Sequence, residues 1–218
     1  MTFFGQIDPQ YLPVPDDGNI EVIPFLEASK QILPFFGKLG KTFGVIQSDV
    51  NGNVTKIHNR QQILNQENGG GEKSDNLKTF RQLLEEDIRL NYQKNDKSTC
   101  VSLLWLKRGM DFICRFLQSI VDDTRSGKKS ESLKTITQNA YEQTLKMHHN
   151  WMVRQVFSLV SHAAPWRADL IKILCNGNES LEDECINDME NYTKILRPNV
   201  DNLDCLLKDL KIEVEDKD

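Results

Sequence analysis

The sequence lacks the signals of several common protein classes. No apolar stretch approaches the roughly 18 residues that a membrane-spanning helix needs. The five cysteines are odd in number and form no Cys-x-x-Cys pair, and no signal peptide follows Met1, so we expect reduced thiols in a cytoplasmic protein. We also expect no lipid anchor, since Thr2 and the terminal Glu215-Asp-Lys-Asp do not match a lipidation signal. The net charge of −5 gives no support for a nucleic-acid partner, because nucleic-acid-binding domains are usually basic.

The sequence also has little that indicates an enzyme. It contains no Gly-x-Ser-x-Gly, no recognisable Cys/His nucleophile pair and no metal-ligand set. His148 and His149 are adjacent, and neighbours on a helix point about 100° apart, which suits chelation poorly. We therefore expect no catalysis, no metal and no cofactor.

What the sequence does contain is helical periodicity along most of its length, without a convincing strand or internal repeat. About eight helices with short connections predict a single all-α domain. The predicted helices cover residues 21–39, a segment from the region of Asp49 to about Asn65, and then 76–93, 98–121, 131–147, 149–163, 166–175 and 180–208.

The ends and one loop differ from this pattern. Residues 1–18 hold three of the seven prolines and are expected to form an extended arm. The domain itself is predicted over residues 19–210, followed by an acidic tail at 211–218. Residues 66–75 include three consecutive glycines and form the clearest predicted loop.

A compact polar cluster is the first candidate site. Asp49, Asn53 and Lys56 are spaced by four and seven residues, so on a helix their side chains fall within roughly 60° of one another. A carboxylate, an amide and an ammonium together suit a ligand with several hydroxyls, such as a sugar. The ordinary alternative is a solvated helix face with a charge pair.

The segment from Leu103 to Val121 has two apolar stripes instead of one. Its polar residues occupy an arc of only about 100°, and Trp105, Phe112 and Phe116 form the second apolar stripe. Such a helix is buried on two sides. Either both stripes are filled by core, or one of them lines an apolar cavity.

The segment from His149 shows an unusual placement of large side chains. On a helix, Trp151 falls on the polar face and His149 on the apolar one, which reverses the usual arrangement. Trp166 lies close by in sequence, and two Trp residues near one surface suggest contact with a membrane interface. The alternatives are an accidentally exposed Trp and a core His.

Several segments, in order along the chain, resemble the glycolipid transfer protein family. They are Pro24-Phe25-Leu26-Glu27-Ala28, Pro34-Phe35-Phe36, Asp49-Val-Asn-Gly-Asn53-Val-Thr-Lys56, Leu104-Trp105-Leu106-Lys107-Arg108-Gly109, Tyr141-Glu142, His149-Asn150-Trp151 and Ala163-Ala164-Pro165. The match covers roughly residues 20 to 200, and the joint pattern is specific.

This resemblance implies a two-layer all-α sandwich, expected to be a monomer, that carries one glycosphingolipid of the glucosylceramide, galactosylceramide or lactosylceramide type between membranes. It implies that Asp49, Asn53 and Lys56 bind the first sugar, with Trp105 stacked beneath it. His149 would bond the carbonyl of the ceramide amide and Asp49 its N–H. The implied hydrocarbon tunnel is lined by Phe36, Val101, Phe112, Phe116, Leu145 and Phe157, and Trp151 and Trp166 would dock transiently on the membrane.

The sequence departs from the family in places. The aromatic Tyr near the family's C-terminus has no clear counterpart, and Val101 stands where a Leu is common. His162 and Trp166 occupy positions that are commonly Tyr.

Three rival functions are compatible with the same residues. An enzyme would use Asp49 and His149 as an acid–base pair, but the motifs for hydrolysis are missing. A lipid sensor would bind the same ligand and signal to a protein. Ceramide-1-phosphate transfer would need several cations around a phosphate, and Asp49 would repel it.

Overall fold

The computed structural model describes residues 1–67 and 76–212 and confirms an all-α single domain. The described residues contain no β-strand, only two isolated bridges. The α-helices are α1 (Val22–Lys30), α2 (Leu33–Lys38), α3 (Gly44–Glu67), α4 (Phe80–Arg89), α5 (Thr99–Arg125), α6 (Lys134–Thr144), α7 (Trp151–His162), α8 (Arg167–Leu174) and α9 (Glu182–Asp209). Short 3₁₀ turns lie at Phe4–Gln6, Lys41–Phe43, Lys146–His148 and Glu179–Leu181.

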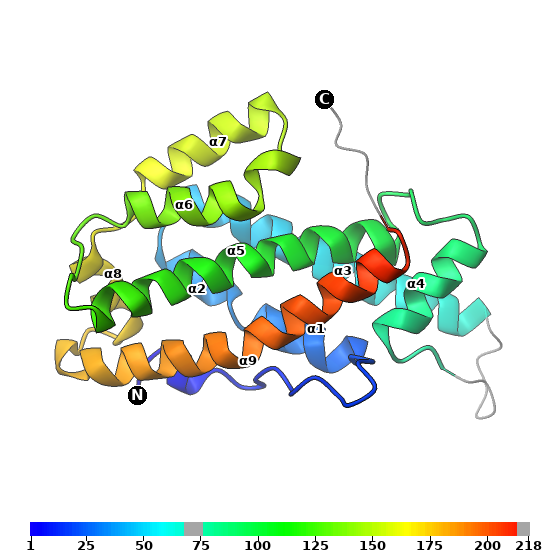
Figure 1. Cartoon of the computed structure of the whole chain (residues 1–218), viewed down its shortest axis with the longest axis horizontal. Helices are drawn as coiled ribbons and strands as arrows, with labels where there is room; N and C mark the ends of the chain where they lie inside the picture. The colour runs from blue at the N-terminus through cyan, green and yellow to red at the C-terminus, as the bar shows by residue number, and fades with distance from the viewer. Residues whose placement is uncertain (68–75, 213–218) are drawn as a thin grey trace.

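Helix α5 is the centre of the molecule. It runs between α6 on one side and α9 on the other, while α3 lies behind it (Figure 1). Its first turn is capped by Ser98, whose side chain accepts a hydrogen bond from the Val101 N–H. Its side chains are buried around most of the circumference, including Leu103, Met110 and Leu117. The prediction of a helix buried on two sides is therefore confirmed.

The first predicted helix is divided in two, which corrects the single helix expected over residues 21–39. Helix α1 ends at Lys30 and α2 begins at Leu33. Pro34 explains the break, because its ring would clash with the carbonyl of Lys30 four residues earlier and it has no N–H to donate. Pro34 instead occupies the first turn of α2, where a proline is tolerated.

Other boundaries also differ from the predictions. Helix α3 continues to Glu67, and α5 continues to Arg125. Helix α4 begins at Phe80 instead of residue 76, because Thr79 and Gln82 form a capping box there. The three glycines of the predicted loop and residues 213–218 of the predicted tail lie outside the described residues.

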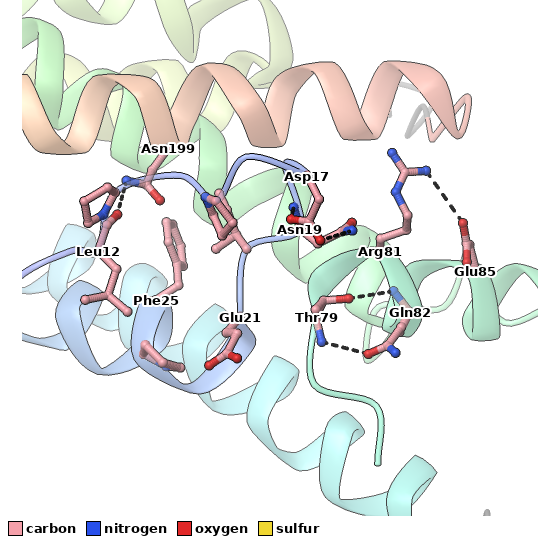
Figure 2. Close-up of a pocket in the computed structure, with 14 residues that line it drawn as sticks. Leu12, Asp17, Asn19, Glu21, Phe25, Thr79, Arg81, Gln82, Glu85 and Asn199 are labelled. Carbon is pink, nitrogen blue, oxygen red and sulfur yellow. Dashed lines mark hydrogen bonds and ion pairs between the residues drawn. The ribbon is translucent and has the colours of Figure 1, made fainter. Parts of the chain in front are cut away.

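The N-terminal arm packs against the domain. Phe3, Phe4 and Tyr11 are buried, and Phe4 and Tyr11 each contact Tyr192 of α9. The arm, α1, the start of α4 and α9 enclose a hollow of about 620 Å³, here called the arm groove (Figure 2). Its lining residues include Leu12, Asp17, Glu21, Phe25, Arg81 and Asn199.

No helix in the described part of the chain is long and apolar enough to cross a membrane.

Candidate functional site

The polar cluster predicted from the sequence lies along one face of α3. Asn53 is buried and donates from Nδ2 to the Asp49 backbone carbonyl at 3.0 Å, one helical turn earlier. Lys56 is half-buried one turn further on. The three side chains border an open hollow of about 640 Å³, here called the polar groove, whose other lining residues are Lys41, Gly44, Val45, Ser48 and Gly52.

An apolar cavity of about 270 Å³ adjoins the polar groove, and the two share Val45 and Asp49. It is enclosed mainly by α3, α5 and α7. Its apolar lining residues include Val50, Phe112, Leu145, Val153, Val156 and Phe157. Asp49 and His149 are the polar side chains that line it. Asp49 therefore stands at the boundary between a polar surface hollow and a largely apolar cavity.

The Asp49 carboxyl is exposed on its outer side, yet the neighbouring protein atoms crowd it. This desolvation raises its pKa above the usual value, opposed by a hydrogen bond from Asn53 and by the charge of Lys56. A ligand donor that reached Asp49 would meet an acceptor that water solvates incompletely.

Trp105 and His149 form a stacked pair beside the cavity. Their ring centroids are 5.6 Å apart and their planes differ by 21°. The Arg108 guanidinium carbon lies 4.9 Å from the Trp105 ring centroid. Trp105 is half-buried on α5, so part of the indole stays accessible. The stacked pair brings together two residues that are 44 positions apart in the sequence, which the helical periodicity alone did not connect.

His149 does not lie on a helix, contrary to the prediction. It comes after the 3₁₀ turn Lys146–His148 with extended backbone angles (φ −97°, ψ 130°), and α7 begins at Trp151 with Asn150 as its N-cap. The helical position predicted for His149 was therefore wrong in its geometry, although His149 does line the cavity.

The His149 imidazole is held by neighbours on two sides. Its Nδ1 lies 3.0 Å from the Tyr141 hydroxyl oxygen, and its ring stacks on Trp105. Desolvation lowers the pKa of His149 to about 4, with further lowering by the positive charges of His148, Arg108 and Arg154. The imidazole is consequently neutral at physiological pH.

Exposed apolar side chains lie on α7 and in the segments that flank it, and together they are here called the outer patch. Trp151 is 72% exposed, and Trp166, just before α8, is 60% exposed. Met147, Met152 and Leu159 are also exposed. The helical wheel placed Trp151 among polar residues only, but Met152 and Leu159 lie about 80–100° from it on the same helix. Helix α7 therefore presents apolar residues both to the cavity and to the outside.

Comparison with known proteins decides the family. The family model described as Glycolipid transfer protein (GLTP) matches residues 20–176. The chain belongs to the glycolipid transfer protein family. The glycolipid transfer protein of Danio rerio is 34% identical over 185 residues, which cover 84% of each chain. The pleckstrin homology domain-containing family A member 8 of Rattus norvegicus is 30% identical over 79% of this chain, which spans about a third of that relative.

Solved structures agree on the fold of the family. The structure of FAPP2, which selects simple glycosphingolipids using the GLTP fold, matches with a TM-score of 0.81 at 27% identity and covers 100% of this chain and 99% of its own. The fungal glycolipid transfer protein HET-C2 matches with a TM-score of 0.76 at 25% identity, over 98% and 100%. Human ceramide-1-phosphate transfer protein, at 15% identity and a TM-score of 0.73 over 97% and 94%, shares the fold.

The residues that the family resemblance implied for a tunnel divide into two groups. Phe112, Leu145 and Phe157 line the apolar cavity. Phe116 is buried next to Phe112, and Phe36 is buried against Phe35, but neither lines the cavity. Val101 is half-buried in the first turn of α5, away from the cavity lining. Their roles as tunnel residues remain predictions.

Several lining residues of this family member were not singled out from its sequence. Val153, Val156 and Val160 all line the cavity. Their spacing of three and seven is the usual apolar stripe of a surface helix, which normally packs against core. Tyr141 was noted only within the family resemblance, because its bond to His149 depends on the 3₁₀ turn between them.

Proposed function

We propose that this protein transfers glycosphingolipids between membranes without chemical change to the lipid. One observation carries the proposal: a polar groove and an apolar cavity meet at a single carboxylate, Asp49. A glycosphingolipid has the same division, with a hydroxyl-rich head, one amide and two hydrocarbon chains. The family membership and the glycolipid transfer proteins among its relatives support this assignment.

The polar groove would hold the sugar head. Asp49 would accept hydrogen bonds from sugar hydroxyls, while Asn53 and Lys56 would donate to them. Trp105 lines neither the polar groove nor the apolar cavity, but it stacks on His149 beside them, and we propose that the part of its indole left exposed packs against the apolar side of a pyranose. A lipid without these hydroxyls would leave the groups of the groove unpaired, and unpaired buried groups are costly, so the groove would select the headgroup.

The apolar cavity would accept the hydrocarbon chains, with Phe112, Leu145 and Phe157 in its wall. Its volume of about 270 Å³ is below the roughly 300–1,000 Å³ of pockets that enclose drug-sized ligands. Two long hydrocarbon chains therefore require the cavity walls to move apart. We propose that Phe36, Val101 and Phe116 become lining residues when the walls move. Each buried CH₂ is worth about 0.8 kcal/mol in bilayer or cavity alike, so a carrier needs only to match the membrane.

The outer patch on α7 would contact the membrane. Indole rings favour the headgroup boundary, and the exposed Trp151 and Trp166 lie close to the helix that also lines the cavity. We propose a monomer in the cytoplasm that binds membranes transiently, takes glucosylceramide, galactosylceramide or lactosylceramide, and performs no catalysis.

The same site argues against ceramide-1-phosphate as the main ligand. A phosphate dianion needs several cations, whereas the polar groove offers two lysines, Lys41 and Lys56, together with the Asp49 carboxylate, which would repel a phosphate. A lipid sensor would use the same contacts and would differ only in passing a signal to a protein partner once the lipid is bound.

Native mass spectrometry after exposure to a mixed lipid extract would test the proposal, together with transfer between vesicles by the purified protein. We expect one glycosphingolipid per chain and transfer without other proteins. Binding of ceramide-1-phosphate in preference to glycosphingolipids, or of neither lipid, would overturn the assignment. Binding without transfer would support a sensor instead.

A further inference from the structure

Beside His149, the buried Tyr141 side chain has a well-defined position that no role assigned above uses. Its ring stacks on Phe157 with centroids 3.6 Å apart and planes within 7°. Its hydroxyl oxygen lies 3.0 Å from Nδ1 of His149. Within the described part of the chain, this is the one hydrogen bond that the hydroxyl makes. Burial raises the pKa of Tyr141 to about 12, so the hydroxyl keeps its proton.

The direction of this bond is set by the protons available. A neutral imidazole carries one N–H, on Nδ1 or on Nε2. If Nδ1 carried it, the Tyr141 hydroxyl would accept, and its own proton would be left without an acceptor inside the protein. A buried donor without an acceptor is costly. One arrangement satisfies both the Tyr141 hydroxyl and the His149 ring. In it, the hydroxyl donates to Nδ1 and the imidazole carries its proton on Nε2.

The ligand makes this choice of tautomer important. A secondary amide presents one N–H donor and one carbonyl acceptor, so its site needs one acceptor and one donor. Asp49 can supply only the acceptor, because an ionised carboxylate has no proton to donate. The other polar side chain that lines the cavity is His149. With Nδ1 occupied by Tyr141, Nε2 is the ring nitrogen left for a ligand, and it must donate.

We propose that Tyr141 is a positioning residue that fixes His149 as a hydrogen-bond donor towards the cavity, and thereby sets the site's selectivity for an amide. The proposal rests on the proposed function, in which an amide-containing lipid enters the cavity. Tyr141 itself would not touch the ligand. It would act by excluding the tautomer in which Nε2 of His149 carries no proton. In that tautomer the amide would face two acceptors, Asp49 and Nε2, and no donor.

Tyr141→Phe tests this with little risk to the fold, because it keeps the stacked ring and removes only the hydroxyl. Nitrogen-15 NMR of the histidines at neutral pH reports the tautomer directly, and His149→Ala identifies the signals. We expect a protonated Nε2 and an unprotonated Nδ1 in the parent protein, and averaged signals in Tyr141→Phe. A parent proton on Nδ1, or identical signals in the variant, would overturn the proposal.

Binding measurements provide the second readout. Tyr141→Phe should weaken glucosylceramide binding about 2- to 10-fold, the usual range for one hydrogen bond. It should leave unchanged the binding of a dialkylglycerol glucoside, which has the sugar and chains but no amide. In a His149→Ala background the same substitution should have no further effect. Equal losses for both lipids would show that Tyr141 is merely structural.

The outcomes separate this inference from the function on which it rests. If the parent protein binds no glucosylceramide, the proposed function fails, while the NMR result still decides whether Tyr141 sets the tautomer. If the parent binds glucosylceramide and Tyr141→Phe binds it equally well, only the inference about Tyr141 is lost.

Discussion

The arm groove and the polar groove have nearly equal volumes, about 620 and 640 Å³, but they use their polar groups differently. In the arm groove these groups bind one another. Asp17 accepts from Asn19, and Arg81 pairs with Glu85 at 3.6 Å. Asn199 donates to the Leu12 carbonyl at 2.9 Å, as Figure 2 shows. The last of these bonds ties the N-terminal arm to α9.

The polar groove is the site that we propose for an outside partner, the lipid headgroup. Lys56 influences Asp49 through its charge, and desolvation leaves the Asp49 carboxyl with a raised pKa. The groove also continues into the apolar cavity. Volume alone therefore does not distinguish a binding site from a hollow between two packed segments. We expect a binding site to keep hydrogen-bonding groups available beside an apolar cavity. Substitutions in the two grooves should test this distinction.

The largest expected effect in the polar groove comes from Asp49→Val. Charge-assisted hydrogen bonds are worth roughly 1.5–3 kcal/mol, so glucosylceramide transfer between vesicles should fall at least tenfold. Because desolvation raises the pKa of Asp49 in the folded state, its charge costs stability at neutral pH. Asp49→Asn should therefore melt at the same temperature as the parent or higher, measured by circular dichroism. Full transfer by Asp49→Val would place the headgroup site elsewhere.

Trp105→Ala should reduce glycolipid transfer about tenfold or more while the helical circular dichroism is retained. The loss of the indole removes the surface on which we propose that a pyranose packs. Trp105→Phe is the matched control and should keep part of the activity, because it keeps an aromatic face. A Trp105→Ala protein that transfers normally would rule out stacking of the sugar on Trp105.

The pH dependence of binding should come from Asp49 and not from His149. The raised pKa of Asp49 means that acid neutralises this acceptor at a higher pH than an ordinary aspartate. His149, with a pKa of about 4, stays neutral from pH 8 down to about pH 5. Glucosylceramide affinity, followed by Trp fluorescence, should therefore fall on acidification in the parent. Asp49→Asn should bind weakly and show a flat profile, and a sloping one would point to another group.

Trp151→Ala should separate docking from binding. Because Trp151 is 72% exposed, its removal should change the unfolding free energy by no more than about 0.5 kcal/mol. Transfer from vesicles should fall several-fold, while binding of a detergent-solubilised glycolipid is unchanged. The blue shift of Trp fluorescence with vesicles should also shrink, with Trp166→Phe as the control. A large drop in melting temperature would identify Trp151 as a structural residue.

The arm groove should give the smallest functional effect. Gln82→Ala removes one half of the capping box with Thr79, which should lower the unfolding free energy by about 1 kcal/mol. Transfer at a temperature where the variant is folded should be unchanged. Chemical denaturation beside a transfer assay measures both quantities. A loss of transfer without loss of stability would show that this groove also binds a ligand.

The sequence predicted the helices better than their interruptions. The two apolar stripes around Leu103 and Phe112 required burial on both sides, and α5 is buried in that way. The break after Lys30 was missed because the apolar period continues across it, although Pro34 excludes a continuous helix. The 3.6-residue helical period placed His149 on the apolar face of a helix. That period does not apply to His149, because the residue follows a 3₁₀ turn and has extended backbone angles. Local periodicity also cannot show that Tyr141, Trp105 and His149 meet, because that contact joins three separate segments.

The two apolar faces of α7 have a kinetic consequence. A helix is only about 10–12 Å across, so an acyl chain could slide from the bilayer around α7 into the cavity while staying in apolar surroundings. A lipid that leaves a membrane unaided exposes its chain to water, at about 0.8 kcal/mol per CH₂, or roughly fourfold in rate for each carbon. Passage along α7 avoids most of that exposure. The logarithm of the protein-mediated rate should therefore depend only weakly on chain length, where spontaneous desorption depends on it steeply.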